Sequence, residues 1–564
     1  MREWLRETHG PGFELLRHFL VHFFDSDLVT SPGQTAAAVI ASSSMFLTWF
    51  PFVTGPLKDK YAHLSALAVP GPYREAIRAD ELWLITLMMS AIGLLTAIKW
   101  QSLFPTLGDY RIIGWFPVRA RQVFGAKLVA LLVVATAAIT VLALLPCVGL
   151  PALSGGRWAL QQSVGVRAVA ATAATVAACY FFFFALMAIQ GVLLNLFRPR
   201  QFLRITGTLQ GLLAGSMLIL IVLSFSIGPP FANRVVRPEL AKWLPPVWYL
   251  GLCQAMSGDP DPAMQALAHR ALVGLAAAVG LVLAAYTVSY RRHRALMIEG
   301  VPTSRKERRW YGPIFDWLVP DPHQQAVVVF LAKGLAGSSQ HRMILMGYGG
   351  FGLAILFSGM IGMLDLVEPA RVVAARFVYA HVILLTFLLI GLRHLFSIPL
   401  ELKANWVFQI NEGEGRRQWL RAVDRSVLFC GAAGMLVIPF PLETRLLGWR
   451  AVSESLLFAA FGLLCYEGLF SSWEKLPFTC SYLPGKKPMW IVALQLLGLL
   501  ALLPVVNAIL LACLYNWAMF AGVLLVLLAV WMRVHTIRRE GLGEVRLCYD
   551  EVPDPAIHGL NLLK

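Results

Sequence analysis

Residues 100–127 read WQSLFPTLGDYRIIGWFPVRARQVFGAK, and the rest of the chain is organised around this stretch. It lies between two apolar runs, yet it is neither apolar nor a plain tether. A helix breaker, Pro105, precedes an aromatic-rich strip that ends at Pro117. This strip keeps an apolar surface that includes Trp115 and Phe116, and such a surface needs protein or lipid headgroups to cover it. The stretch therefore predicts a structured loop between two membrane spans.

The composition is that of a membrane protein with many spans. Of the 564 residues, 58% are hydrophobic and 14% are charged, and the mean hydropathy is +0.66. Apolar runs of about 20 residues recur, and each is long enough to cross a hydrocarbon core of about 30 Å. The formal net charge of +16 resides in the loops between these runs, where membrane topology is the first explanation for basic residues. We therefore expect an all-α polytopic protein embedded in a lipid bilayer, without nucleic-acid binding.

Twelve apolar runs are candidates for transmembrane helices. Those in the first half of the chain cover about 35–54, 82–100, 127–147, 168–196, 207–228 and 270–290. Those in the second half cover about 343–364, 375–397, 427–441, 452–471, 489–510 and 514–533. An even number of spans places both termini on one side, and the loops on that side carry most of the Lys and Arg residues. Both termini and the loop after the second span are therefore predicted to be cytoplasmic.

Two further segments have apolar residues at helical spacing but are too short and too polar to span a membrane. They are 12–25 and 324–335, and we expect each to form an interfacial helix. A mixed-charge loop that includes Lys60 and Glu81 separates the first two spans. Residues 229–269, which connect the fifth and sixth spans, form either an external loop with aromatic residues at headgroup level or a pair of short re-entrant helices.

The order of these features repeats, which divides the chain into two six-span halves, 1–300 and 301–564. In each half an interfacial helix precedes two spans, an aromatic and basic loop, and four more spans. The two loops are 101–127 and 398–426, and a polar tail, 534–564, ends the chain.

Individual residues of the two loops also correspond. Tyr110 aligns with Trp406 when two residues are inserted, and Arg121 aligns with Arg417 at the same offset. The repeat therefore predicts that the two loops have equivalent positions in the two halves.

Sequence motifs for catalysis are absent. The sequence has no phosphate-cradling G-x-x-x-x-G-K-[ST] loop, no H-E-x-x-H and no G-x-S-x-G. We therefore expect no ATPase or other enzymatic activity and no cofactor in this chain. The eight cysteines form no C-x-x-C pair, and His341, His381 and His394 have no ligand spacing, so no metal site is predicted.

Charged residues near the ends of spans are interpreted as reaching the headgroups. Arg393 and His394 lie at the cytoplasmic end of the eighth span, and Glu467 lies toward the same end of the tenth. No acidic residue at the middle of a span is predicted to face a basic partner, which disfavours an ion-coupled carrier. The proline-containing segment 474–485 is interpreted as a tight turn, or alternatively as a second contact with a cytoplasmic partner.

This combination of features resembles the permease subunits of type-2 ATP-binding-cassette exporters. In that family, the loop between the second and third spans holds a cytoplasmic coupling helix against an ATPase subunit. Short external helices connect the fifth and sixth spans, as residues 229–269 would here. The resemblance implies a permease that moves a substrate outward across a cell membrane, in a bacterial inner membrane, with two separate ATPase subunits as partners.

The resemblance also implies which residues bind the ATPase partner. They belong to the two loops: Asp109, Tyr110, Arg111, Trp115, Phe116, Pro117, Arg119, Arg121, Asn405, Trp406, Glu412, Arg416 and Arg417. The second loop departs from the pattern of the first, because the residues 411–415, NEGEG, replace WFPVR. We therefore expect the second half to contact its ATPase differently, or only the first half to make a productive contact.

Two other functions remain open on the sequence. A membrane-embedded enzyme, or an assembly or scaffold protein, would use the basic loops to hold anionic lipid or another protein. A secondary carrier would need no ATPase.

Overall fold

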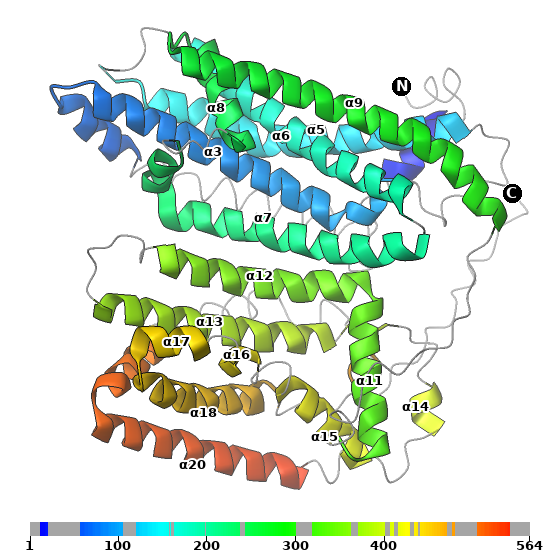
Figure 1. Cartoon of the computed structure of the whole chain (residues 1–564), viewed down its shortest axis with the longest axis vertical. Helices are drawn as coiled ribbons and strands as arrows, with labels where there is room; N and C mark the ends of the chain where they lie inside the picture. Colours follow the sequence, from blue (N-terminus) through cyan, green and yellow to red (C-terminus); the bar gives the residue numbers. More distant parts are fainter. Residues whose placement is uncertain are drawn as a thin grey trace, which may run out of the picture. The chain divides into compact units, whose positions relative to one another are not determined.

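The computed structural model describes part of the chain, and the structural statements below refer to this part. The described residues are 12–20, 57–104, 120–156, 158, 163–197, 199–236, 243–299, 319–361, 370–396, 398–400, 406–410, 416–428, 434–437, 440–470, 476–479 and 505–541. Within these ranges the chain is helical apart from short connections, and it contains no strand (Figure 1). The chain separates into two compact units, Met1–Ser304 and Arg305–Lys564, whereas the sequence placed the boundary after residue 300.

The first unit is built from long helices that pack lengthwise (Figure 1). Its described helices are 12–20, 57–66, α3 (Gly71–Ile98), the single turn η1 (Trp100–Ser102), α5 (Ala120–Leu153), α6 (Val164–Leu196), α7 (Pro199–Val236), α8 (Pro245–Met256) and α9 (Pro262–Glu299). α3 packs along α7 and α6, while α9 packs along α6 and α8. The core between them contains fully buried aromatic side chains such as Tyr73 and Trp100.

The second unit mixes long helices with several short ones. Its described helices are α11 (Pro322–Gly337), α12 (Ser339–Ile361), α13 (Ala370–Phe396), α14 (Trp406–Ile410), α15 (Arg416–Val427), α16 (Gly434–Val437), α17 (Phe440–Leu447), α18 (Arg450–Phe470), Val505–Tyr515 and α20 (Trp517–Gly541). α12 packs along α13, and α18 packs against both α13 and α20. Small residues permit close contact, since a Cβ at Gly391 of α13 would lie 2.7 Å from Tyr348 of α12.

Six of the described helices are long and apolar enough to cross a membrane. They are α3, α5, α6, α9, α18 and α20. Their outward faces are apolar, and on α20 the side chains of Leu525 and Val526 are 68% and 62% exposed within the chain. Such a surface is a liability in water but is satisfied by lipid acyl chains. The prediction of an all-helical protein with several membrane-spanning helices is thus confirmed, while the count of twelve and the repeat stay predictions.

Several predicted boundaries differ from the structure. The predicted first span, 35–54, and most of the eleventh, 489–510, lie outside the described residues. α3 begins at Gly71 rather than near 82, so part of the predicted mixed-charge loop belongs to its first turns. Of the predicted ninth span, 427–441, the structure describes the last residues of α15, the short helix α16 and the first residues of α17, and the residues between them lie outside the described part.

The connection between α7 and α9 contains the short helix α8, which is buried against α3, α6 and α9. Tyr249 and Leu250 are fully buried, and a Cβ at Gly251 would lie 2.4 Å from the Cβ of Leu267. Tyr249 of α8 therefore packs among the helices of the unit, while the choice between an external loop and re-entrant helices for 229–269 stays a prediction. Trp243, which precedes α8 and is 74% exposed, is the residue that remains available to an interface.

Candidate functional site

The structure describes the ends of the two predicted partner-binding loops rather than their centres. Outside the described residues lie Asp109, Tyr110, Arg111, Trp115, Phe116, Pro117, Arg119, Asn405 and Glu412. Arg121 belongs to the first turn of α5, and Arg416 and Arg417 begin α15. Trp406 begins α14 and is 60% exposed.

The first loop starts from a rigid anchor in the first unit, at Trp100 and Leu103. Both side chains are buried, at 0% and 1% exposed. Gln190 of α6 donates to the carbonyl oxygen of Trp100 at 2.7 Å, and Tyr286 of α9 donates to that of Leu103 at 2.6 Å. Gln210 of α7 donates to the last turn of α3 at 3.0 Å. A displacement of the loop would therefore be transmitted to α6, α7 and α9 through these hydrogen bonds.

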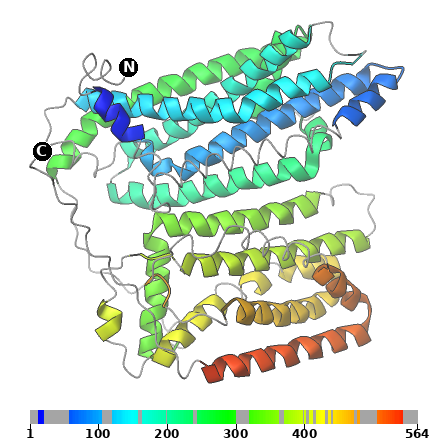
Figure 2. The ribbon, with the colours of Figure 1, turned by 180° about the vertical axis from the view of Figure 1, so that it is seen from behind.

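The far end of the first loop is braced by the helix 12–20, which lies against the start of α5 (Figure 2). Leu15 and Phe19 of this helix pack with Val123 and Ala130 of α5. The ammonium nitrogen of Lys127 lies 4.6 Å from the centre of the Phe19 ring, within the range of a cation–π interaction. The short helix predicted at 12–25 thus stabilises the helix that follows the loop.

The second loop also starts from an anchor, here in the second unit. The imidazole Nε2 of His341 lies 3.1 Å from the carbonyl oxygen of Ile398. The backbone N–H of Phe478 donates to the carbonyl of Phe396, and the N–H of Leu400 donates to the carbonyl of Phe478, both at 3.1 Å. These bonds tie the end of α13 to the segment 476–479.

The segment 476–479 is a buried turn. Leu476, Phe478 and Thr479 are at most 2% exposed. Phe478 has a φ of 68°, which is rare for a bulky residue and is held here by its two backbone hydrogen bonds. In the described residues 476–479 the interpretation as a tight turn is therefore correct. The rest of the segment 474–485 lies outside the described residues, and the alternative contact with a cytoplasmic partner stays a prediction.

α14 presents apolar side chains outward while one of its residues holds it to the unit. The Phe408 ring lies 5.0 Å from that of Phe330 in α11 and 6.0 Å from that of Trp419 in α15. On the same short helix Trp406 is 60% exposed and Ile410 is 73% exposed. An indole and a branched aliphatic side chain are thus exposed on a short helix that Phe408 anchors.

The helix after the second loop is braced by a short helix, as in the first unit. Val327 and Leu331 of α11 share a buried cluster with Trp419 and Val423 of α15. The guanidinium of Arg425 donates to the side-chain oxygen of Gln324 at 2.8 Å. α11, which the sequence predicted as an interfacial helix over 324–335, therefore positions α15 and, through Phe330, α14.

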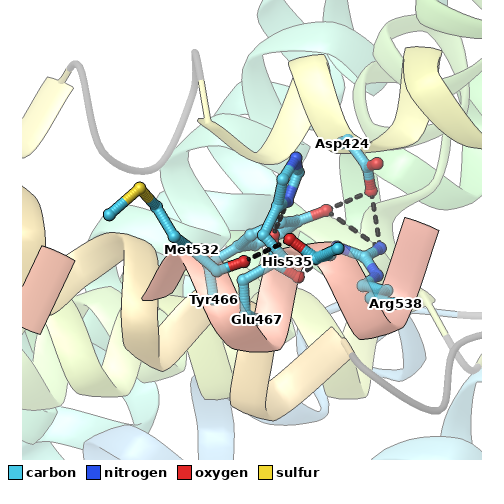
Figure 3. Close-up of polar contacts among 7 residues, drawn as sticks. Asp424, Tyr466, Glu467, Met532, His535 and Arg538 are labelled. Atoms are coloured by element: carbon cyan, nitrogen blue, oxygen red, sulfur yellow. Dashed lines mark hydrogen bonds and ion pairs between the residues drawn. The ribbon is translucent and has the colours of Figure 1, made fainter. Parts of the chain in front are cut away.

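A charge cluster that is buried at Glu467 and Arg538, and partly exposed at Asp424 and His535, joins α15 to α18 and α20 (Figure 3). The Nη2 atom of Arg538 lies 2.8 Å from Oδ1 of Asp424, and its Nη1 atom lies 2.9 Å from Oε2 of Glu467. The hydroxyl of Tyr466 donates to Asp424, and Nδ1 of His535 lies 2.5 Å from Oε1 of Glu467. The guanidinium thus uses its planar fork to bridge carboxylates from two different helices.

The position of Glu467 corrects the sequence interpretation. Its side chain is 2% exposed and paired with Arg538 and His535, whereas the sequence analysis expected it to reach the headgroups. Removing one partner from such a group leaves a buried charge unpaired, which is unfavourable. The cluster therefore fixes α15, α18 and α20 relative to one another.

A second buried group of ionisable residues lies between α13, α17 and α18. Nδ1 of His381 is 3.0 Å from Oε1 of Glu443 and 3.8 Å from Oε1 of Glu454. The three side chains are at most 5% exposed, and one ligand atom from each lies within 4.8 Å of the others. Sequence spacing missed this group because His381 lies on α13, about 60 residues before Glu443, while Glu443 and Glu454 belong to the consecutive helices α17 and α18.

In the first unit, Asp80 joins α3 to the helix 57–66. The ammonium of Lys60 lies 2.8 Å from both carboxylate oxygens, and the Tyr61 hydroxyl donates to Asp80 at 2.6 Å. Burial and the adjacent Asp80 carboxylate raise the pKa of Tyr61 well above its usual value, so the hydroxyl stays protonated as the donor. This network is a structural fastening of the two helices.

A neighbouring set of polar residues fastens α8 to α3. Gln254 donates to Glu81, and Arg78 pairs with Asp259. They line a cavity of about 30 Å³, room for no more than a water or two. The complete lining is Arg74, Ile77, Arg78, Glu81, Arg167, Gln254, Ser257 and Asp259. The cavity is too small for an organic substrate, so this polar cluster has a structural role.

No protein-family model matches the chain, and neither a curated protein nor a solved structure is similar to it.

Proposed function

We propose that this chain is the permease subunit of an ATP-binding-cassette exporter and works with separate ATPase subunits. The observation that carries the proposal is α14, whose Trp406 and Ile410 are exposed while Phe408 is packed on α11 and α15. A short helix with this division of its side chains is suited to docking in an apolar groove of a partner. Aromatic anchors of this kind dominate the energetics of protein interfaces.

The arrangement around the two loops supports the proposal of two related halves. In each unit a short helix packs on the first turns of the helix that follows the loop: 12–20 on α5 in one, and α11 on α15 in the other. In each unit the residues before the loop are also anchored by hydrogen bonds to neighbouring segments. These shared features favour contacts with two ATPase subunits at corresponding positions of the two halves, although the sequences of the two loops differ.

The charge cluster provides a path for mechanical coupling in the second half. Movement of α14 would be passed through Phe408 to α15, and from Asp424 of α15 through Arg538 to α18 and α20. In the first half the hydrogen bonds from α6, α7 and α9 take the same role. Closure of the ATPases on ATP would then tilt membrane helices as rigid bodies and move a substrate outward.

Hydrolysis of ATP is assigned to the partner, because the sequence has no phosphate-cradling loop. In this proposal the chain is not itself an enzyme, needs no organic cofactor and is a multi-pass protein of a bacterial inner membrane. Both loops and both termini then lie in the cytoplasm, on the side where basic residues concentrate.

Photo-crosslinking from α14 tests the proposal. A photoreactive amino acid at Ile410 should form a covalent adduct with a protein that carries a phosphate-cradling loop, identified by mass spectrometry of the band. The matched control is the same probe at Trp243, which is equally exposed but is predicted to lie on the other side of the membrane. Adducts from Ile410 with lipid alone, in cells that express the full chain, would contradict the proposal.

A further inference from the structure

The group formed by His381, Glu443 and Glu454 has an uncommon electrostatic character. The two acidic side chains are 1% and 5% exposed, and the described contacts pair them with one histidine and no lysine or arginine. With a neutral imidazole the group has a formal charge of −2 in a medium of low dielectric constant. Ionised carboxylates are strongly disfavoured there unless a cation or protons neutralise them.

The carboxylate oxygens also lack donors. Among the described residues, neither oxygen of Glu454 accepts a hydrogen bond, and Oε1 of Glu443 accepts none although it lies 3.0 Å from His381. The other oxygen of Glu443 accepts a hydrogen bond from Ser455 at 3.3 Å. Three buried oxygen atoms with unused lone pairs thus adjoin one imidazole, whereas buried polar atoms in proteins are nearly always hydrogen-bonded.

We infer that His381, Glu443 and Glu454 bind a divalent transition-metal ion, with Zn²⁺ as the best fit. One imidazole nitrogen and two carboxylate oxygens are a common donor set for Zn²⁺. Ligand atoms about 2.0–2.2 Å from a tetrahedral ion lie roughly 3.3–3.6 Å from one another. The observed separations of 3.0 Å and 3.8 Å from Nδ1, and at most 4.8 Å among all three, bracket this value.

The imidazole favours a transition metal over calcium or magnesium. Ca²⁺ takes six to eight oxygen ligands and Mg²⁺ keeps several waters, whereas three side chains, one of them a nitrogen ligand, suit Zn²⁺ with a fourth position for water. The ring of His381 stacks on Phe458 with centroids 3.7 Å apart, which fixes the plane of the imidazole. Fixed ligand orientation of this kind raises metal affinity.

A bound ion would hold three helices together. Glu443 comes from α17, a helix of only 8 residues, and the ion would join it to α13 and α18. It would also replace the repulsion between two buried carboxylates by attraction to a common cation. This metal site is independent of the proposed exporter function, since it makes no use of α14 or of an ATPase.

Metal titration of the purified full-length chain tests the inference. After treatment with a chelator, the protein in detergent should bind one Zn²⁺ per chain, measured by elemental analysis after desalting. Co²⁺ should give the visible absorption bands of a low-symmetry, four-coordinate site, and Zn²⁺ should abolish them by displacement. Removing a direct ligand should weaken binding by at least about 100-fold, more than the loss of a residue that only hydrogen-bonds to a ligand does.

Glu454→Gln is the informative variant, because it removes a ligand charge while keeping the volume of the side chain. His394→Gln is the matched control, since it alters another histidine of α13 and should leave Zn²⁺ affinity unchanged. The wild-type measurement keeps the test valid if Glu454→Gln does not fold. Absence of stoichiometric Zn²⁺ and Co²⁺ binding by the wild type would overturn the inference and leave protons as the neutralising charges. Unchanged affinity in a folded Glu454→Gln would overturn it equally.

Discussion

Arg538 of α20 lies 2.9 Å from Glu467 of α18, and the two side chains are only 7% and 2% exposed. The same guanidinium reaches Asp424 of α15, so one residue connects the helix after the second loop to two helices of the membrane-spanning type. An ion pair in this position adds little net stability compared with apolar packing. Removing only one of its two partners is strongly destabilising, because the other charge is then left buried and unpaired. It is therefore better understood as a device that fixes geometry than as a source of folding free energy.

Substitution of Glu467 by alanine should destabilise the protein strongly. The change leaves Arg538 with only Asp424 as a carboxylate partner, and breaking a buried pair costs about 3–5 kcal/mol. Thermal unfolding followed by intrinsic tryptophan fluorescence measures the effect, since the chain has 17 tryptophans. The control is Glu14→Ala. It breaks the ion pair between Glu14 and Arg17, and both of these side chains are about half exposed. That change should have almost no effect. Equal melting temperatures for the two variants would contradict the role of the cluster.

Gly251 of α8 should not tolerate a side chain. A Cβ there would lie 2.4 Å from Leu267 and 2.8 Å from the carbonyl oxygen of Met264 on α9. Overpacking of this kind costs about 1–3 kcal/mol, so Gly251→Ala should lower the melting temperature. Gly280→Ala, at an open position of α9, is the matched control and should be neutral or slightly stabilising. If Gly251→Ala were as stable as the control, the packing of α8 on α9 would have to be looser than described.

The contrast between α6 and the charge clusters shows what the sequence could predict. α6 spans Val164–Leu196, close to the predicted 168–196, because an uninterrupted apolar run is visible to a hydropathy window. The first turns of α3 were missed because they carry Asp80 and Glu81, which look like loop residues. The residues that pair with Asp80 and Glu81 lie on the helix 57–66 and on α8, too far along the chain for a hydropathy window to include them. Local composition therefore gives no sign that these two acidic side chains are buried.

The candidate sites were harder to predict for the same reason. Glu467 and Arg538 are 71 residues apart, and His381, Glu443 and Glu454 come from three helices. Periodicity and spacing report on neighbours along one helix, not on pairs formed by tertiary packing. Trp406, by contrast, is predicted to bind a partner because it aligns with Tyr110 of the first loop. Its side chain is exposed, which is compatible with that role.

Single cysteines at exposed positions test the topology. A membrane-impermeant maleimide should label a cysteine at Trp243 in intact cells, because the connection before α8 is predicted to be external. A cysteine at Ile410 should react only after the membrane is permeabilised. Both positions are more than 70% exposed, so access is limited by the membrane rather than by packing. A cysteine at the fully buried Leu250 is the control for labelling of unfolded protein. If the cysteines introduced at Trp243 and at Ile410 were labelled from the same side of the membrane, the predicted topology would be wrong.

The purified chain alone should not hydrolyse ATP above background. The expectation follows from the absence of a G-x-x-x-x-G-K-[ST] loop, whose backbone amides and lysine would hold the phosphates. Phosphate release is measured on the folded chain in mild detergent, after affinity capture and size-exclusion chromatography have removed co-purifying ATPases. Turnover that follows the chain through every step of purification would show that the assignment of hydrolysis to a partner is wrong.

The aromatic residues of the first loop should hold the ATPase more strongly than its arginines do. Replacing Trp115 and Phe116 together by alanine should release the ATPase in a pull-down, because buried aromatic anchors often contribute about 2 kcal/mol or more. Arg119→Ala should weaken the complex only modestly and mainly at low salt, since a charge at the rim of an interface acts on association rate. These residues lie outside the described part of the chain, so the expectation rests on the sequence of the loop.

Trp406→Ala provides the comparison in the second loop, whose departure from the first predicts a smaller loss of bound ATPase. If the aromatic residues only anchor the loops at the headgroups, the double variant of Trp115 and Phe116 would lose thermal stability or membrane insertion yet keep its partner. Melting temperature and the amount of bound ATPase, measured on the same preparations, separate the two roles. A stoichiometric complex with undiminished ATP-driven export in the double variant would exclude the first loop as the coupling contact.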